Sequence, residues 1–255
     1  VVAALRESGR VRVAEPDLVR TAFAVNDPYF VDQWHMADID VETAWAHTTG
    51  AGVTVAVIDT GLHTGGEDTP VHVSGGYDFA YDDNDPSDFD GHGTHVAGTI
   101  AQATDNGRGV AGVAYGATVM PLKALDDNGS GYSSDIIDAI LYAADHGAQV
   151  ANMSLGSKYG STAEQSALQY AASKGVVLVA ASGNDGSRRQ VSYPASYPET
   201  IAVGSTTIGY AVPRYSNRGA GLDLVAPGGD WADANGDGYY DGVLQETHDG
   251  TSFRY

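Results

Sequence analysis

The chain has 255 residues, 42% of them apolar, and its 13 basic and 33 acidic side chains give a formal net charge of −20. That length suits one large α/β domain. The charge argues against nucleic acid and anionic membranes as partners. The absence of cysteine excludes disulfides, thiolate metal sites and a cysteine nucleophile. No apolar run reaches the roughly 18 residues needed to span a bilayer.

The predicted elements begin with an edge strand near the N-terminus, in VRVAEPDLV. From about residue 50 short β-branched runs alternate with helical patterns, which predicts a parallel sheet with helices on both faces. Buried strands are expected at 53–58, 149–153 and 176–181, and helices at 92–103, 133–146 and 161–175. Ser161 and Glu164 have capping-box spacing at the start of the last helix.

Three polar residues lie on turns, where open α/β sheets place their chemistry. Asp59 directly follows the first buried strand, His92 lies in GHGTHVAGTIA, and Ser252 lies late in the chain in DGTS. A hydroxyl nucleophile needs a base, and the base needs an orienting carboxylate, so this set favours acyl transfer. Taken singly, each residue also fits a structural role: a turn former, a packed helix residue and a cap.

His92 and His95 raise the alternative of a zinc hydrolase. Enzymes of the HExxH type need two histidines four residues apart with a glutamate base between them. Here the histidines are three apart, and Gly93 and Thr94 lie between them. We therefore expect no zinc, and we expect His95 to pack behind the site, pointing into the sheet.

An acidic loop late in the chain has the oxygen spacing of an EF-hand-type calcium loop: oxygens at positions one, three and five, glycine at six and a carbonyl at seven. The residues are Asp233, Asn235, Asp237, Gly238 and Tyr239, followed by Asp241. Position twelve is Leu244 instead of a bidentate glutamate, so other groups must complete the geometry or the affinity is weaker. The alternative is an acidic surface turn without metal.

A second acidic cluster precedes His92. Its members are Asp78, Asp82, Asp83, Asp85, Asp88 and Asp90. Carboxylates at this density repel one another unless a cation lies among them. The stretch is therefore a second candidate for calcium.

The wording of these segments resembles one family. VAVIDTG, HGTHVAGTIA and GTS occur in the order Asp, His, Ser, and NMSLG, AASGNDG, YPASYP, ETIAVGS and LVAPGG lie between the last two. Together they resemble the subtilisin-like serine proteases, whose triad has this order. The resemblance covers roughly residues 26–252 and implies a three-layer α/β fold with a mainly parallel central sheet.

The resemblance implies a secreted serine endopeptidase acting on proteins or peptides. Ser252 would be the nucleophile, His92 the general base and then acid, and Asp59 the group that orients the imidazole. Asn184 falls where the family places the side-chain amide of its oxyanion hole. The alternative for Asn184 is a turn residue before Asp185.

The resemblance also implies two segments that pair with an extended peptide substrate by strand addition. They contain Gly129, Ser130 and Gly131, and Ser154, Leu155 and Gly156. Ala181 and Gly183 would line the pocket for the substrate residue before the scissile bond. Because this segment carries no charge, we expect broad specificity that favours uncharged side chains.

Structural calcium is implied at the second cluster, because thermophilic members of the family bind calcium there. Asp78, Asp83 and Asp85 are the ligands expected from their spacing. A third candidate pairs Asp27 with Asp105, although HTGGEDTP departs from the family wording where a further ligand is expected.

The ends of the chain carry further expectations. Residues 1–21 resemble the end of an inhibitory propeptide, which would be both inhibitor and chaperone for a monomeric catalytic domain at 22–255, in an extracellular location. At the other end, Arg254 and Tyr255 depart from the family. We expect the chain ending there to fold poorly and to lack activity, because a helix begins at the nucleophile in the family. The alternative function is a non-catalytic, secreted calcium-binding module.

Overall fold

The computed structural model describes residues 25–248 and 252–255, so the predicted propeptide remnant at 1–21 lies outside the described residues. Seven strands form one parallel sheet in the order β2-β3-β1-β4-β5-β6-β7. The strands are β1 (Thr54–Asp59), β2 (Tyr77–Asp78), β3 (Thr118–Lys123), β4 (Val150–Met153), β5 (Val177–Ala181), β6 (Thr200–Thr206) and β7 (Leu224–Pro227). The predicted parallel sheet is confirmed.

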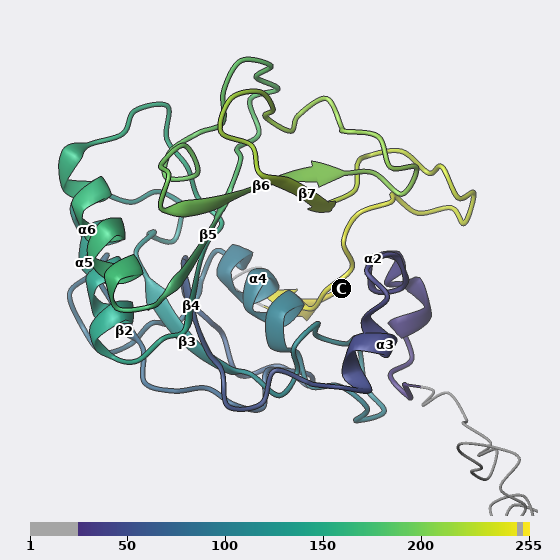
Figure 1. The fold of residues 1–255 in the computed structure, drawn as a ribbon. Helices are drawn as coiled ribbons and strands as arrows, with labels where there is room; N and C mark the ends of the chain where they lie inside the picture. The colour runs from purple at the N-terminus through teal and green to yellow at the C-terminus, as the bar shows by residue number, and fades with distance from the viewer. Residues whose placement is uncertain (1–24, 249–251) are drawn as a thin grey trace, which may run out of the picture.

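Helices cover both faces of this sheet, as Figure 1 shows. They are α4 (His92–Ala101), α5 (Ser133–Asp145) and α6 (Thr162–Ser173), with η1 (Phe30–Asp32), α2 (Trp34–Asp38) and α3 (Val41–Trp45) beside the sheet. The predicted strands and helices agree with these bounds to within about two residues. No described helix is long and apolar enough to cross a membrane.

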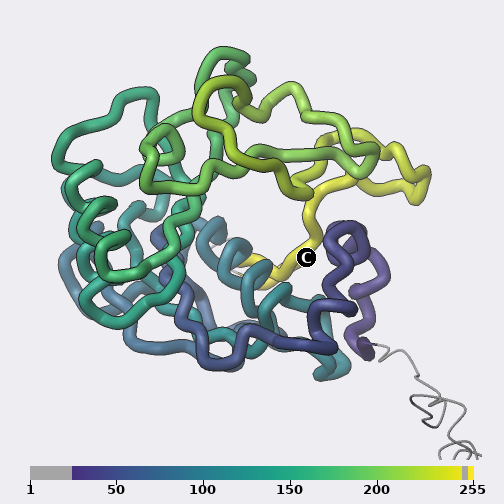
Figure 2. The backbone as a smooth tube through the Cα atoms, in the orientation of Figure 1, coloured from purple at the N-terminus to yellow at the C-terminus, as the bar shows by residue number. Residues whose placement is uncertain are grey.

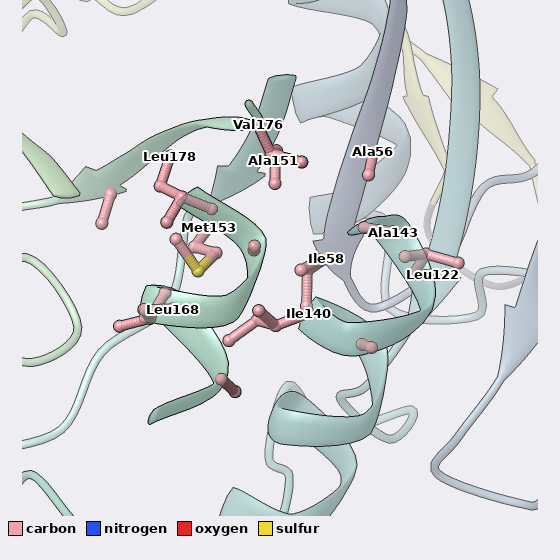
Figure 3. Packing of buried hydrophobic residues seen from close by; sticks show 14 of the residues in the cluster. Ala56, Ile58, Leu122, Ile140, Ala143, Ala151, Met153, Leu168, Val176 and Leu178 are labelled. Atoms are coloured by element: carbon pink, nitrogen blue, oxygen red, sulfur yellow. The ribbon is translucent and has the colours of Figure 1, made fainter. Parts of the chain in front are cut away.

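Alternation along β1 separates the two faces, because successive side chains of a strand point to opposite sides. Ala56 and Ile58 belong to the core cluster that includes α5 and α6. Val55 and Val57 belong to the cluster that includes α4. Figure 3 shows Ile58 pointing toward Ile140 of α5. The carboxyl end of β1 therefore emerges between two packed layers.

The last described segment forms a small antiparallel pair, β8 (Thr247–His248) with β9 (Phe253–Arg254). Figure 2 shows this C-terminal segment running down beside α4. The Thr247 hydroxyl donates to the Gly91 carbonyl at 2.6 Å. Residues more than 150 positions apart in the sequence are thus brought to the start of α4.

Candidate active site

The N-terminus of α4 is held against the end of β1 by close backbone packing. Gly91 has φ of 100°, and a Cβ on Gly93 would lie 2.3 Å from the Gly61 carbonyl, so both positions need glycine. The Gly93 amide donates to the Thr60 hydroxyl at 2.8 Å. This packing fixes His92, the first residue of the helix, beside Asp59.

Asp88 is a positioning residue that the sequence analysis had assigned only to an acidic cluster. It is fully buried and accepts hydrogen bonds from the Gly91 amide at 2.9 Å and from the Thr94 amide and hydroxyl at 2.9 and 2.6 Å. Burial opposes its ionisation, but these hydrogen bonds hold the pKa of Asp88 below its usual value. An Asp three residues before a helix-opening Gly is the signal that could have identified it.

Asp59 and His92 form the central pair. The Nδ1 of His92 lies 2.7 Å from Asp59 Oδ1, which also accepts the Thr60 amide at 2.8 Å. Asp59 is fully buried, and its Oδ2 has no hydrogen-bond partner among the described residues, whereas half of the His92 side chain is exposed. The hydrogen bond that His92 donates to Asp59 raises the pKa of His92, and burial opposes this rise. The arrangement leaves Nε2 of a neutral His92 free to accept a proton.

Ser252 lies between β8 and β9 and is exposed. Thr247 contacts Gly91, which directly precedes His92 in the chain, so this strand pair lies at the start of α4. Residues 249–251, which join the two strands, lie outside the described residues. The fold therefore brings the strand pair that flanks Ser252 to the start of α4.

A cleft of about 520 Å³ opens beside His92. All six predicted peptide-binding residues line it: Gly129, Ser130, Gly131, Ser154, Leu155 and Gly156. Ala181, Gly183 and Asn184 line a second cavity of about 750 Å³, in which His95 also lies. An oxyanion-hole amide is expected to line the cleft of His92, whereas Asn184 lines the neighbouring cavity. Ser154 lines both, so the two cavities adjoin.

Asn217 is a second positioning residue that local sequence patterns did not indicate. It is buried. Its side-chain Nδ2 donates to the Ser182 carbonyl at 3.0 Å, and its backbone amide donates to the Gly183 carbonyl at 2.9 Å. Its Oδ1 accepts the Ser187 amide at 2.8 Å. Asn217 thereby fixes both sides of the turn that presents Asn184.

The imidazole of His95 contacts the backbone of a distant segment. Its Nε2 lies 3.1 Å from the Val243 carbonyl, and burial lowers its pKa. Within residues 25–248 and 252–255, no three His, Cys, Asp or Glu side chains gather where they could hold a metal ion. Any calcium site there needs backbone or amide oxygens as well.

Comparison with known proteins decides the family. The model of the subtilase family matches residues 50–253. The chain belongs to the subtilase family.

Among relatives of this subtilase, a thermophilic serine proteinase of Bacillus sp. strain AK1 is 45% identical over 90% of the chain and 58% of its own length. Thermitase of Thermoactinomyces vulgaris is 40% identical over 81% of the chain and 74% of its own length. A solved protease from Pseudoalteromonas arctica superposes with a TM-score of 0.81 at 35% identity, over 91% of the chain and 81% of that protein. The chain thus spans little more than half the length of the Bacillus relative, and the subtilisin-like fold is confirmed.

The subtilase's EF-hand-like loop is organised around Asp233. Its two carboxylate oxygens accept the Gly236 and Gly238 amides at 2.8 and 3.1 Å. Asn235 and Asp237 bond each other at 2.8 Å, and the Tyr239 amide donates to Asp237. All of these residues are exposed.

Asp241 differs from the rest of this loop because it is buried, with 3% of its surface exposed. Its Oδ2 accepts the Ala234 amide at 2.7 Å, but its Oδ1 has no hydrogen-bond partner among the described residues. A buried carboxylate oxygen without a donor is costly unless a cation compensates it. This oxygen fits a calcium ligand.

The second acidic cluster is a compact turn. Asp78 and Asp83 exchange two backbone hydrogen bonds at 3.0 Å, and the Asp83 side chain accepts the Asp85 amide at 2.8 Å. Asp78 is buried, which raises its pKa, and the charge of Asp83 adds to the rise. The structure brings Asp78 and Asp83 together, while the Asp85 carboxylate accepts the Ser87 hydroxyl.

The third candidate contains a residue that the sequence analysis missed. Buried Asp27 accepts the backbone amides of Asp105 and Asn106 at 2.8 and 2.9 Å. Asp68, from the divergent HTGGEDTP stretch, lies on the other side of this loop and accepts the Asn106 side-chain amide at 2.9 Å and the Val110 amide at 3.0 Å. Burial raises the pKa of Asp68, and the Asp27 charge contributes. Asp68 therefore fits the place of the further ligand expected from this stretch.

Proposed function

We propose that this subtilase is a serine endopeptidase that hydrolyses peptide bonds through Asp59, His92 and Ser252. The observation that supports this most directly is the 2.7 Å contact between His92 Nδ1 and a fully buried Asp59 carboxylate. Buried carboxylates of this kind hold the imidazole in the tautomer that can take a proton at Nε2. The matching family model and the serine proteinases among the relatives support the same activity.

In the proposed reaction the Ser252 hydroxyl attacks the substrate carbonyl carbon, and His92 takes its proton at Nε2. The imidazolium then gives that proton to the departing amine, so that the peptide bond breaks and an ester to Ser252 remains. Water hydrolyses the ester with His92 again as base, which restores the free hydroxyl. The buried charge of Asp59 stabilises the imidazolium in both steps.

The Asn184 side-chain amide is proposed to donate to the oxyanion that forms on the substrate carbonyl. The peptide would extend between residues 129–131 and 154–156, where the cleft is lined by glycine and small side chains. Ala181 and Gly183 would accept the residue before the scissile bond. Their lack of charge favours broad specificity at that position.

Calcium is proposed as a structural ion. Asp241 Oδ1 supports a site at the loop that contains Asp233, Asn235, Asp237 and the Tyr239 carbonyl. Buried Asp27 and Asp68, separated by Asn106, support a second. Bound calcium would supply positive charge to these acidic loops and take no part in bond cleavage. A third calcium site is proposed at Asp78, Asp83 and Asp85.

The remaining proposals rest on the resemblance to the subtilases. They are an extracellular location, a monomeric catalytic domain at 22–255, and regulation by the chain's own propeptide, whose last residues would be 1–21. Protein and peptide substrates follow from the family.

A serine-directed reagent tests the catalytic proposal. We expect a fluorophosphonate to add one label, on Ser252, to the whole protein that contains this chain, as measured by intact and peptide mass spectrometry, because only an activated serine reacts. Ser252→Ala should abolish labelling, while Ser173→Ala, at an exposed position of α6, should leave it unchanged. A whole protein that binds calcium and stays unlabelled would support the non-catalytic module instead.

A further inference from the structure

Glu164 is an acidic residue on the wall of the cleft that contains His92. It lies in the first turn of α6 with 7% of its surface exposed. Ile136, Leu155 and Tyr193 line the same cleft. A carboxylate among these apolar side chains is costly to ionise unless it is well bonded or paired with a cation.

The capping of α6 does not account for the burial of the Glu164 carboxylate. The Ser161 hydroxyl accepts the Glu164 amide at 3.1 Å, as in a capping box, and in that motif the glutamate side chain returns to the amide of the capping serine. Here the Ser161 amide donates instead to the Tyr197 hydroxyl at 2.7 Å. The Glu164 carboxylate is thus released from the capping interaction.

The Glu164 carboxylate accepts few hydrogen bonds from the described residues. Its Oε2 accepts the Tyr197 hydroxyl at 2.9 Å, and that single proton is shared with the Ser161 carbonyl, also at 2.9 Å. An ionised carboxylate can accept about four hydrogen bonds. Burial raises the pKa of Glu164, and the Tyr197 hydrogen bond only opposes it in part.

No cation of the described chain neutralises Glu164. The ion pairs formed among residues 25–248 and 252–255 do not include it. Lys158, the lysine nearest to it in sequence, pairs with Asp185 at 3.4 Å and is largely exposed. A buried carboxylate at the edge of a binding cleft is therefore left without a counter-ion.

We propose that Glu164 is a specificity-determining residue of the cleft and that it selects peptides carrying a lysine or arginine side chain at the position that faces it. This inference rests on the proposed peptide-binding function. An ammonium or guanidinium group would supply both the charge and the hydrogen bonds that the carboxylate lacks, while the apolar stem of the side chain packs on Ile136 and Leu155. This position is separate from the uncharged pocket at Ala181 and Gly183.

Tetrapeptidyl p-nitroanilides test this selection, with lysine or norleucine placed in turn at each of the four positions. Norleucine keeps the stem of lysine and lacks only the ammonium group. Equilibrium binding is measured by competition against a fluorescent peptide, and kcat/KM is measured separately. At alkaline pH we expect lysine to bind about tenfold more tightly than norleucine at one position only, since a hydrogen bond between charged groups is worth about that factor.

Two substitutions of Glu164 and one control separate charge from structure. Glu164→Gln retains a hydrogen-bond acceptor for Tyr197 and should remove the lysine preference, and Glu164→Leu should favour norleucine. Asp138→Asn, on an exposed position of α5, changes the net charge equally and should keep the preference. Equal binding of lysine and norleucine by the wild-type chain, or an unchanged preference in Glu164→Gln, would overturn the inference.

The two readouts distinguish this inference from the proposed activity. A lysine preference in binding without any cleavage supports the role of Glu164 and contradicts the proposed catalysis. Cleavage and binding that are indifferent to lysine contradict only the role of Glu164. If no peptide binds the wild-type chain, the cleft is not a peptide site, and both proposals are wrong.

Discussion

His35 of α2 is buried, with 4% of its surface exposed, and neither ring nitrogen has a hydrogen-bond partner among the described residues. Burial, followed by the nearby charge of His95, lowers the pKa of His35 to about 4. The unfolded chain binds a proton near the ordinary value of 6.5, so at pH values between 6.5 and 4 it holds more protons than the folded chain. The stability contributed by neutral His35 is therefore complete above about pH 6.5 and is lost as the pH falls toward 4.

Replacing His35 should flatten this part of the pH dependence. From the difference between the two pKa values, we expect His35 to account for about 3 kcal/mol of the stability that the wild-type chain loses between pH 7 and pH 4. Urea unfolding at both pH values would show a smaller loss for His35→Leu. The exposed His47→Gln serves as the control and should behave as the wild type. Identical losses in His35→Leu and wild type would contradict the assignment.

The titration of His92 is a second expectation at the residue scale. Asp59 is the first cause of its raised pKa, and Asp90 and Asp88 contribute less. Asp59→Asn should lower the pKa of His92, measured from its imidazole ¹⁵N shifts, and Asp90→Asn should lower it by a smaller amount. This measurement needs no turnover. A pKa that falls equally in both variants would show that the His92 charge is set by the general acidic field and not by the pair.

Helix α6 is stabilised more by its buried face than by its intrinsic preferences. Leu168 is fully buried in the cluster that also contains Met153 of β4 and Leu178 of β5, as Figure 3 shows. Its start is capped by Ser161, and Gly175 with φ of 89° follows its end. One side chain thereby connects the helix to two neighbouring strands.

The same substitution at a buried and an exposed leucine measures this packing. Leu168→Ala should lower the free energy of unfolding by about 2–5 kcal/mol, because it leaves a cavity between α6 and the sheet. Leu224 lies on β7, the last strand of the sheet, and 48% of its surface is exposed. Leu224→Ala should therefore lower the free energy of unfolding by less than about 1 kcal/mol. Denaturant unfolding of both variants checks this. Similar losses would mean that α6 is not firmly packed in solution.

At the scale of the whole molecule, the charge of −20 and the buried carboxylates favour the binding of cations by the folded chain. A ligand that binds only the folded chain stabilises it by about 2.7 kcal/mol at one hundred times its dissociation constant. In a chain of this size we therefore expect saturating calcium to raise the Tm by about 5–10 °C above its value in chelator. Calorimetry measures both.

Two substitutions separate calcium binding from simple charge repulsion. Asp68→Asn should reduce the rise in Tm with calcium, yet in chelator it should be no less stable than the wild type, because it relieves repulsion with Asp27. Asp237→Ala should weaken calcium binding in a calorimetric titration through the other loop. The exposed Asp138→Asn should change neither. Equal calcium responses in all four chains would contradict both proposed sites.

The sequence by itself determined the parallel sheet, the strands and helices that flank the site, and the family. These follow from local chemistry: apolar periodicity, caps and glycines act within one or two turns of the chain, and ordered motifs need no contacts to be recognised. It also placed Asp59 and His92 at the ends of elements whose carboxyl and amino ends meet. Their 2.7 Å contact follows from that topology. Strand β3 was not among the predicted strands, because Pro121 interrupts its run of apolar residues.

Only the tertiary structure decided which distant side chains share an environment. Asp68 comes from a stretch without family wording, and it reaches the Asp27 loop because the fold places the loop at Asn106 between them. Asn184 and His92 face adjoining cavities, which no spacing predicts. In the sequence Glu164 has the position of a capping-box glutamate. In the structure the hydroxyl of Tyr197, 33 residues later, accepts the Ser161 amide in its place and donates to the Glu164 carboxylate. Burial and counter-charge depend on such long-range packing, and local sequence patterns do not contain it.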